Sequence, residues 1–246
     1  VERVQRINYL GPTLSEIAAR ASSMHYLGPL VAPDVAVPKE LDLYARVAQR
    51  VPGSRIVNSA GLVRAMRVAK EPRELALMRK AIDATGRGMR AAMAAARPGM
   101  TEYQLRMIID DDFPQTRAGG LAFAPIVGVA RISTVLHYTG PGENVIRAAD
   151  LILCDIAAEV DYSAADITRT FPVDGRFTPE QRNVYETVLA AQDAAAAKLG
   201  PGAIYEDLQR AANAVMDRAG YRDAFWHGLG HFVGLDVHDV GDYAKP

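Results

Sequence analysis

The chain has 246 residues, of which 49% are hydrophobic and 23% charged, and its 28 basic and 29 acidic side chains give a formal net charge of -1. This composition excludes a disordered chain, a collagen-like repeat and a disulfide-stapled miniprotein, and a near-neutral chain lacks the positive excess that binds nucleic acid or anionic membranes. The longest uncharged stretch, 118–130, contains glycine and proline and is shorter than the ~20 apolar residues of a membrane helix. The single cysteine cannot form an internal disulfide and no basic-then-apolar leader opens the chain, so we expect a soluble, cytoplasmic protein.

The first seventy residues predict an incomplete unit. The stretch 28–38 carries three prolines and no periodic run, a helix is expected at 45–50, and a short strand at 55–58. A segment of this length is not expected to have a core of its own. The sequence begins with Val1 rather than Met, which favours a processed chain or an excerpt of a longer one.

Two helices with clear start signals follow. Apolar residues recur at three- and four-residue steps from Pro72, a favoured first helical residue, until the Pro-Gly pair at 98–99. Thr101 and Gln104 form a capping box, which predicts a second helix that ends at about residue 112. The methionines and leucines on these helices have the spacing of core residues, so we do not interpret them as cofactor contacts.

The middle of the chain is expected to form strands, and helices return after it. The expected strands are 123–129, 134–138 (after a loop at 130–133), 151–160 and 167–173. A capping box of Thr178 and Gln181 begins a helix that ends at Gly200, and a last helix is expected at 205–219. The order helix, Pro-Gly, helix, strand therefore occurs twice, which indicates two related halves.

Two aspartates in the expected strands have an arrangement typical of a metal site. If the strands form a hairpin that turns near Val160 and Asp161, Asp155 directly faces Asp166. Carboxylates opposite each other repel unless a proton or a cation lies between them, and hard divalent cations prefer carboxylate oxygens. The alternative is that one aspartate is a turn residue and the other is exposed.

Three of the five histidines, His227, His231 and His238, lie within twelve residues. The spacing of the first two mimics the helical zinc pair of HExxH enzymes, but two glycines lie between them and no glutamate follows His227, so an irregular or extended backbone is expected. On such a backbone each histidine can point in a different direction, so one could bind a metal while others contact substrate. His137, at the end of an apolar strand, is a further candidate substrate contact. The alternative is that these histidines are structural and hydrogen-bonded. Cys154 lies in an apolar run and is interpreted as a small buried hydrophobic residue rather than a nucleophile.

Five stretches of the chain together carry the pattern of one known family. They are 70–75 (KEPREL), 136–138 (LHY), 155–159 (DIAAE), 166–173 (DITRTFPV) and 227–241 (HGLGHFVGLDVHDVG). They resemble the pita-bread metallopeptidases, and within them the proline-peptidase branch of Xaa-Pro aminopeptidases, nearly continuously from about Glu71 onwards. The resemblance implies an α+β pita-bread fold, incomplete at the C-terminus, with residues 71–246 as a partial catalytic domain. Residues 1–70 are then the remnant of a smaller N-terminal creatinase-like domain and its linker.

The resemblance also implies a metal centre. Asp155 matches a ligand of one metal, Asp166 a carboxylate that bridges both, and His231 a ligand of the other. The implied cofactors are two divalent metal ions, most commonly manganese, and a water held between them attacks the peptide carbonyl.

The remaining histidines match residues of the family that contact substrate. His137 and His238 correspond to the histidines that steady the substrate and the tetrahedral intermediate, and His227 to one that lines the substrate pocket. The implied partner is a peptide with proline in the second position, with no nucleic acid and no membrane, and a homo-oligomer is expected for the full-length form.

The resemblance leaves one large departure and several alternatives. The family completes its site with two glutamates on later strands, and neither occurs here. We therefore expect a chain truncated at both ends, or an incomplete gene product, with little or no peptidase activity. An Xaa-Pro dipeptidase (prolidase) shares the motifs. A creatinase hydrolyses without metals, and a non-catalytic pita-bread domain that binds proteins typically loses ligands. The retained Asp155, Asp166 and His231 argue against these last two.

Overall fold

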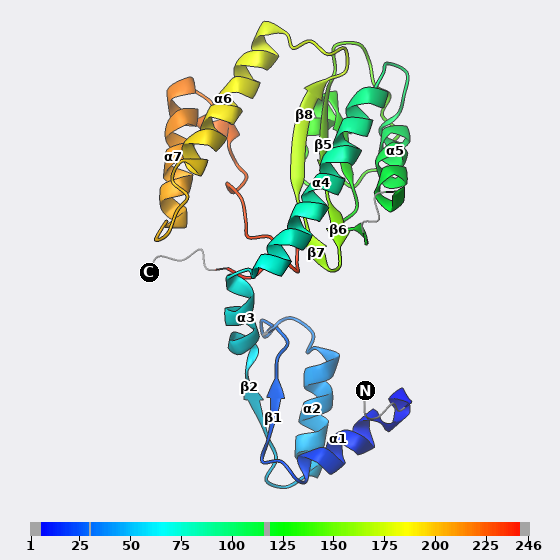
Figure 1. Ribbon diagram of the computed structural model, residues 1–246, viewed down its shortest axis with the longest axis vertical. Helices are drawn as coiled ribbons and strands as arrows, with labels where there is room; N and C mark the ends of the chain where they lie inside the picture. Colours follow the sequence, from blue (N-terminus) through cyan, green and yellow to red (C-terminus); the bar gives the residue numbers. More distant parts are fainter. Residues whose placement is uncertain (1–5, 30, 116–118, 242–246) are drawn as a thin grey trace. The chain divides into compact units, whose positions relative to one another are not determined.

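The computed structural model describes residues 6–29, 31–115 and 119–241, and it separates into two compact units, Val1–Ala69 and Lys70–Pro246 (Figure 1). The first unit holds the 3₁₀ helix η1 (Ile7–Tyr9) and the helices α1 (Leu10–Ala18), α2 (Lys39–Arg50) and α3 (Ala60–Val68), with a parallel pair of strands, β1 (Ser23–Tyr26) and β2 (Arg55–Asn58). The strand at 55–58 is confirmed, whereas the helix expected at 45–50 begins earlier, directly after Pro38.

The first unit has a small core, contrary to the expectation. Ala18, Met24 and Val47 are buried together, one each from α1, β1 and α2, and Leu14 and Ile56 pack against them. Two helices and a strand pair are therefore enough to remove a few apolar side chains from water.

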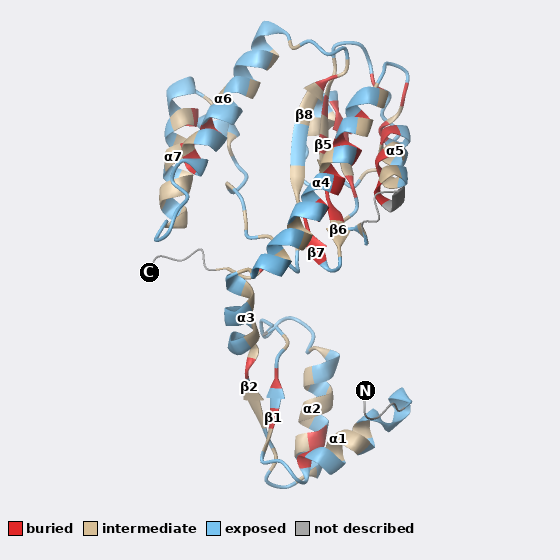
Figure 2. Cartoon of the chain, viewed as in Figure 1, coloured by how far each residue is buried: buried red, intermediate tan, exposed pale blue. Residues whose placement is uncertain are grey.

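The second unit begins with the two helices that the capping signals predict. These are α4 (Pro72–Ala95) and α5 (Glu102–Gln115). The Thr101 box is present in full, since the backbone N–H of Thr101 donates to Gln104 Oε1 at 3.0 Å and the backbone N–H of Gln104 donates to Thr101 Oγ1 at 3.2 Å. Both helices pack against the strands, and Figure 2 shows the buried residues gathered on β5 and on the neighbouring sides of α4 and α5.

Two antiparallel three-stranded sheets follow. One has the order β4 (Ile126–Val129), β5 (Leu151–Ile156), β8 (Ile167–Pro172), and the other β3 (Gly120–Leu121), β6 (Ala158–Val160), β7 (Ser163–Ala164). The single strand expected at 151–160 is thus interrupted at Ala157. At this break, the backbone N–H of Ala158 donates to the buried Thr85 Oγ1 of α4 at 2.9 Å, so a helix side chain satisfies a donor beside the interruption.

Two sequence-based expectations for this region are wrong. Residues 134–138 form no strand: the 3₁₀ helix η2 (Ala130–Thr134) leads into a turn, and Ala130 and His137 both have positive φ angles. The hairpin also turns one residue later than expected. Asp161 and Tyr162, with φ of 46° and 63°, are the two central residues of a tight turn with a left-handed backbone, which places Asp155 opposite Thr168 rather than Asp166.

The last two helices pack against each other. The Thr178 capping box is confirmed at the start of α6 (Pro179–Ala196), which ends before Gly200, and α7 (Tyr205–Ala219) ends at Gly220 in the left-handed conformation, as expected. The 3₁₀ helix η3 (Arg222–Ala224) follows, and residues 225–241 form an irregular segment, which confirms the backbone expected for the histidine cluster. None of the helices in the described ranges is long and apolar enough to cross a bilayer.

Candidate metal centre

The hairpin of β5 to β8 brings the two predicted aspartates into contact, although not as a directly facing pair. Asp155 lies in β5, and Thr168 across from it in β8 donates its hydroxyl to Asp155 Oδ1 at 2.8 Å. Asp166 lies in the short break between β7 and β8, two residues before Thr168, so the aspartates are diagonal neighbours. Burial, and then the negative charge of Asp155, raise the pKa of Asp166, while His231 lowers it.

His231 completes the contact from the irregular segment after α7. Its Nε2 lies 2.9 Å from Asp166 Oδ2, and both side chains are about one-fifth exposed. Its Nδ1 lies 3.0 Å from the carbonyl oxygen of Phe232. Because a carbonyl only accepts hydrogen bonds, Nδ1 carries the hydrogen, so in the neutral ring the lone pair of Nε2 points at the carboxylate of Asp166.

The other three predicted histidines form two ring contacts. The ring of His238 stacks on His231, with centroids 4.1 Å apart and planes 26° from parallel. His137 and His227 meet edge to face at 5.7 Å. The predicted residues therefore gather as one connected set of Asp155, Asp166, His231 and His238, and as a separate pair.

The donor set fits a hard divalent cation. A lone pair on Nε2 that faces a carboxylate oxygen, beside a second carboxylate, requires a proton or a cation to offset the repulsion. Two ligands at right angles around a cation with bonds of ~2.1 Å lie about 3 Å apart, which is close to the 2.9 Å between Nε2 and Oδ2. Donation of the other ring N–H to a backbone carbonyl is the usual support of a metal-binding histidine. Within the described ranges, however, no group of three His, Cys, Asp or Glu side chains is already arranged around one point.

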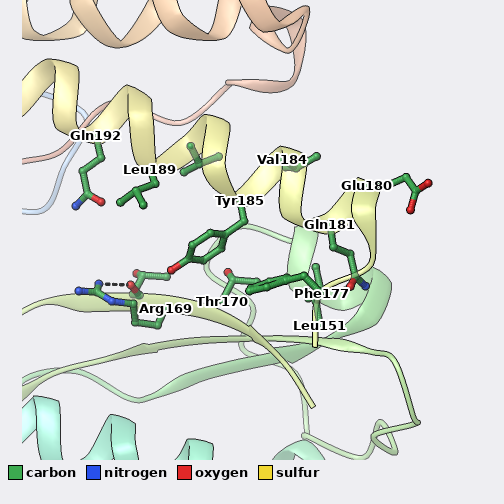
Figure 3. Close-up of a pocket in the computed structure, with 12 residues that line it drawn as sticks. Leu151, Arg169, Thr170, Phe177, Glu180, Gln181, Val184, Tyr185, Leu189 and Gln192 are labelled. Atoms are coloured by element: carbon green, nitrogen blue, oxygen red, sulfur yellow. Dashed lines mark hydrogen bonds between the residues drawn. The ribbon is translucent and has the colours of Figure 1, made fainter. Parts of the chain in front are cut away.

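A large groove lies beside this centre, between β8 and α6 (Figure 3). Its volume is about 570 Å³. Apolar side chains of α6, among them Val184, Tyr185 and Leu189, line the groove, and the rings of Tyr185 and Phe177 lie 4.9 Å apart. Thr168 lines the groove, but none of the six predicted site residues does, so the cluster of acids and histidines and not the groove is the candidate site.

The residues that support the site do not stand out in the sequence. Thr168 lies in the motif 166–173 and Lys70 in the motif 70–75, but the contact of Thr168 with Asp155 depends on the strand register, and the ion pair of Lys70 with Asp239, at 2.8 Å, depends on how distant parts of the chain pack. Glu102, which is 1% exposed, accepts hydrogen bonds from Val129 N–H and from Asn144 Nδ2, each at 2.8 Å. An acidic residue in the first turn of a helix is common, so the position of Glu102 carries no signal of these contacts.

Two carboxylates at a β-hairpin and an imidazole from the irregular segment beside it are donor types that a hard divalent cation prefers. The family of this chain follows from its match to the model of metallopeptidase family M24 over residues 76–246: the chain belongs to this family. Membership makes it a relative of metal-dependent hydrolases, and it implies a divalent metal cofactor.

Within the family, the chain is similar to proline peptidases. It is 34% identical to the Xaa-Pro aminopeptidase of Haemophilus influenzae over 210 residues, which cover 78% of this chain and 49% of that protein. It is also 34% identical to the human Xaa-Pro dipeptidase, over 73% of this chain and 41% of that one. The solved structure of proline aminopeptidase P II from Yersinia pestis matches all of this chain and 61% of its own, with a TM-score of 0.88 and 29% identity. The pita-bread fold is thereby confirmed, and the chain spans about half the length of the curated relatives.

Proposed function

We propose that this chain is part of a metal-dependent aminopeptidase that hydrolyses the bond between an N-terminal residue and a following proline. The observation that carries the proposal is the contact of His231 Nε2 with Asp166, beside Asp155. Similarity to several Xaa-Pro aminopeptidases supports the choice of substrate class. A second candidate, an Xaa-Pro dipeptidase, is supported by the equal identity to the human enzyme of that name.

Three of the predicted residues are proposed as metal ligands, and His238 is proposed to contact the substrate. Asp155, Asp166 and His231 would hold two divalent metal ions, which we propose to be manganese. Thr168 would orient Asp155 through its hydrogen bond. When bound, such ions supply Lewis acidity, which favours the attack of water on a peptide carbonyl. The stacked ring of His238 lies next to His231 and can donate a hydrogen bond to the substrate carbonyl.

The second pair of histidines serves the substrate. His137, held in a turn with φ of 52°, contacts the peptide, and His227 lines the pocket for it. The Nδ1 of His227 lies 2.8 Å from the carbonyl oxygen of Gly228, which leaves Nε2 for another partner. We further propose that residues 1–70 are the remnant of an N-terminal creatinase-like domain, and that the full-length protein is a cytoplasmic homo-oligomer.

The 246-residue chain is expected to have little or no activity. A dinuclear site needs about five protein ligands to hold two cations with open positions for water and substrate, and Asp155, Asp166 and His231 are only three. The proposed metal affinity of this chain is correspondingly weaker than that of a site with five ligands, but it remains measurable by titration with Mn²⁺.

The test assays this chain with added Mn²⁺ on an Xaa-Pro tripeptide and on an Xaa-Pro dipeptide, beside a form extended to the length of the relatives. The extended form should cleave the tripeptide, and cleavage of the dipeptide alone would favour the second candidate. In the extended form, His137→Ala and His238→Ala should each lower kcat by about 10²-fold with unchanged metal content. Comparable turnover by the short and extended forms would contradict the proposed ligand set.

A further inference from the structure

The segment that carries His231 and His238 is closed on itself by backbone hydrogen bonds. The N–H of Asp239 donates to the carbonyl of Phe232 at 2.9 Å, and the N–H of Gly234 donates to the carbonyl of Asp236 at 3.0 Å. The carbonyl of Gly234 accepts from the N–H of Ala164 in β7 at 2.8 Å, which ties the segment to the hairpin two residues before Asp166. Residues 231–239 thus form a compact loop, fixed at one point to the hairpin.

A second attachment is an ion pair that lies almost out of water. Lys70 Nζ, just before α4, is 2.8 Å from Asp239 Oδ2, and the two side chains are only 13% and 1% exposed. By contrast, the pair of Arg182 with Glu186 lies on the surface, with both side chains more than half exposed. A charge pair shielded from water is strong, whereas an exposed one contributes little.

Packing around the pair leaves no free space. A Cβ atom on Gly234 would lie 2.8 Å from Lys70 Cε and would overlap the carboxylate of Asp239. The loop therefore accepts only glycine at this residue if the ion pair keeps its place. Lys70, Gly234 and Asp239 form one rigid contact between the start of α4 and the loop.

The ion pair lies directly beside the candidate centre in the chain. Asp239 follows His238, whose ring stacks on His231 at 4.1 Å, and His231 in turn contacts Asp166. We propose that Lys70 and Asp239 are a positioning pair, which sets His238 and His231 against the acidic hairpin. The significance for catalysis rests on the proposed function, whereas the positioning itself can be measured without it.

Loss of the lysine charge should release the loop. Without the ammonium group, the buried carboxylate of Asp239 loses the cation at 2.8 Å, and outward movement of the loop would return it to water. The neighbouring residue His238 then leaves its stacked contact with His231.

The first measurement uses the metal-free chain and needs no activity. Proton NMR should show a nuclear Overhauser contact between the rings of His231 and His238, and Lys70→Met should reduce it at least threefold. The contact between His137 and His227 should persist as an internal control. Val47→Ala, which removes a buried side chain from the core of the first unit, is the matched variant that loses stability without touching the loop.

The second measurement is the affinity for Mn²⁺, by titration of the same variants. Lys70→Met should bind at least tenfold more weakly than the wild-type chain, and Val47→Ala should bind as the wild-type chain does. If the wild-type chain binds no Mn²⁺, the proposed function fails while the ring contact still decides the positioning role. An unchanged ring contact in Lys70→Met overturns the positioning role alone. If Lys70→Met does not fold, Asp239→Asn takes its place, because this variant removes the charge and keeps the shape. Its ring contact and its Mn²⁺ affinity should fall as expected for Lys70→Met.

Discussion

Glu102 is expected to hold in place the segment that carries His137. The carboxylate is buried at the start of α5 and accepts from the backbone of Val129 and from the side chain of Asn144, the latter also bonded to the Tyr138 hydroxyl. These partners lie on both sides of His137, whose φ of 52° requires support from its surroundings. Replacing Glu102 should therefore loosen both ends of this segment at once.

The structure gives the size of the effect. Each hydrogen bond to a charged acceptor contributes roughly 1.5–3 kcal/mol, and Glu102→Ala also leaves two donors without a partner, so we expect a loss of about 3–5 kcal/mol. Glu102→Gln keeps one acceptor oxygen but turns an amide toward the second donor, so about 2 kcal/mol should be lost. For a unit of this size, these losses lower Tm by roughly 6–20 °C and 4–8 °C.

Thermal unfolding followed by circular dichroism measures both changes. Glu143→Gln is the matched control, since Glu143 lies on the same segment with an exposed side chain and should leave Tm within about 1 °C of the wild type. A Tm of Glu102→Ala equal to that of this control would refute the assigned role. The NMR signals of His137 should broaden in Glu102→Ala and remain sharp in Glu143→Gln.

Three further predictions follow from burial and from the sheet edge. Because the pKa of Asp166 is raised from 3.8, the folded metal-free chain binds the proton more tightly than the unfolded chain does. The free energy of unfolding should therefore fall as the pH rises from 3.8 through the raised pKa, and Asp166→Asn should flatten this dependence in urea titrations. Burial first, and Asp155 second, raise the pKa of Cys154 to about 12, so a thiol reagent at pH 8 should label this residue only after unfolding. Since β8 is an edge strand beside an apolar groove, the chain should self-associate at high concentration, and Thr170→Lys should reduce the aggregate seen by light scattering.

Local signals in the sequence predicted the helices well, because helix ends depend on neighbouring residues. The Thr101 and Thr178 capping boxes, and Gly220 after α7, mark starts and ends that the structure confirms. The strand expected at 134–138 failed because an alternating apolar pattern carries no information on whether a partner strand is present. Here, Glu102 and the left-handed residues Ala130 and His137 impose a turn instead.

For the candidate site, the residue types could be predicted and the geometry only in part. A carboxylate at Asp155, within an expected strand, indicated a cation or a proton as its partner. The register depends on a turn at Asp161 and Tyr162, which have a left-handed backbone although neither is a glycine, so the sequence does not mark the turn. The pairing of Lys70 with Asp239 joins residues far apart in the chain, and no local pattern announces such a contact.

The measurement that tests the central claim most directly is the titration of the metal-free chain with Mn²⁺, with unbound Mn²⁺ followed by electron paramagnetic resonance. Wild-type chain should bind Mn²⁺, and Asp166→Asn and His231→Ala should each weaken binding at least tenfold, because each removes a donor atom of the contact at 2.9 Å. Asp161→Asn, which removes a carboxylate from the nearby turn, should bind as the wild type does. Equal affinity of the wild-type chain and His231→Ala would contradict the claim that the hairpin and the histidine loop form one metal centre.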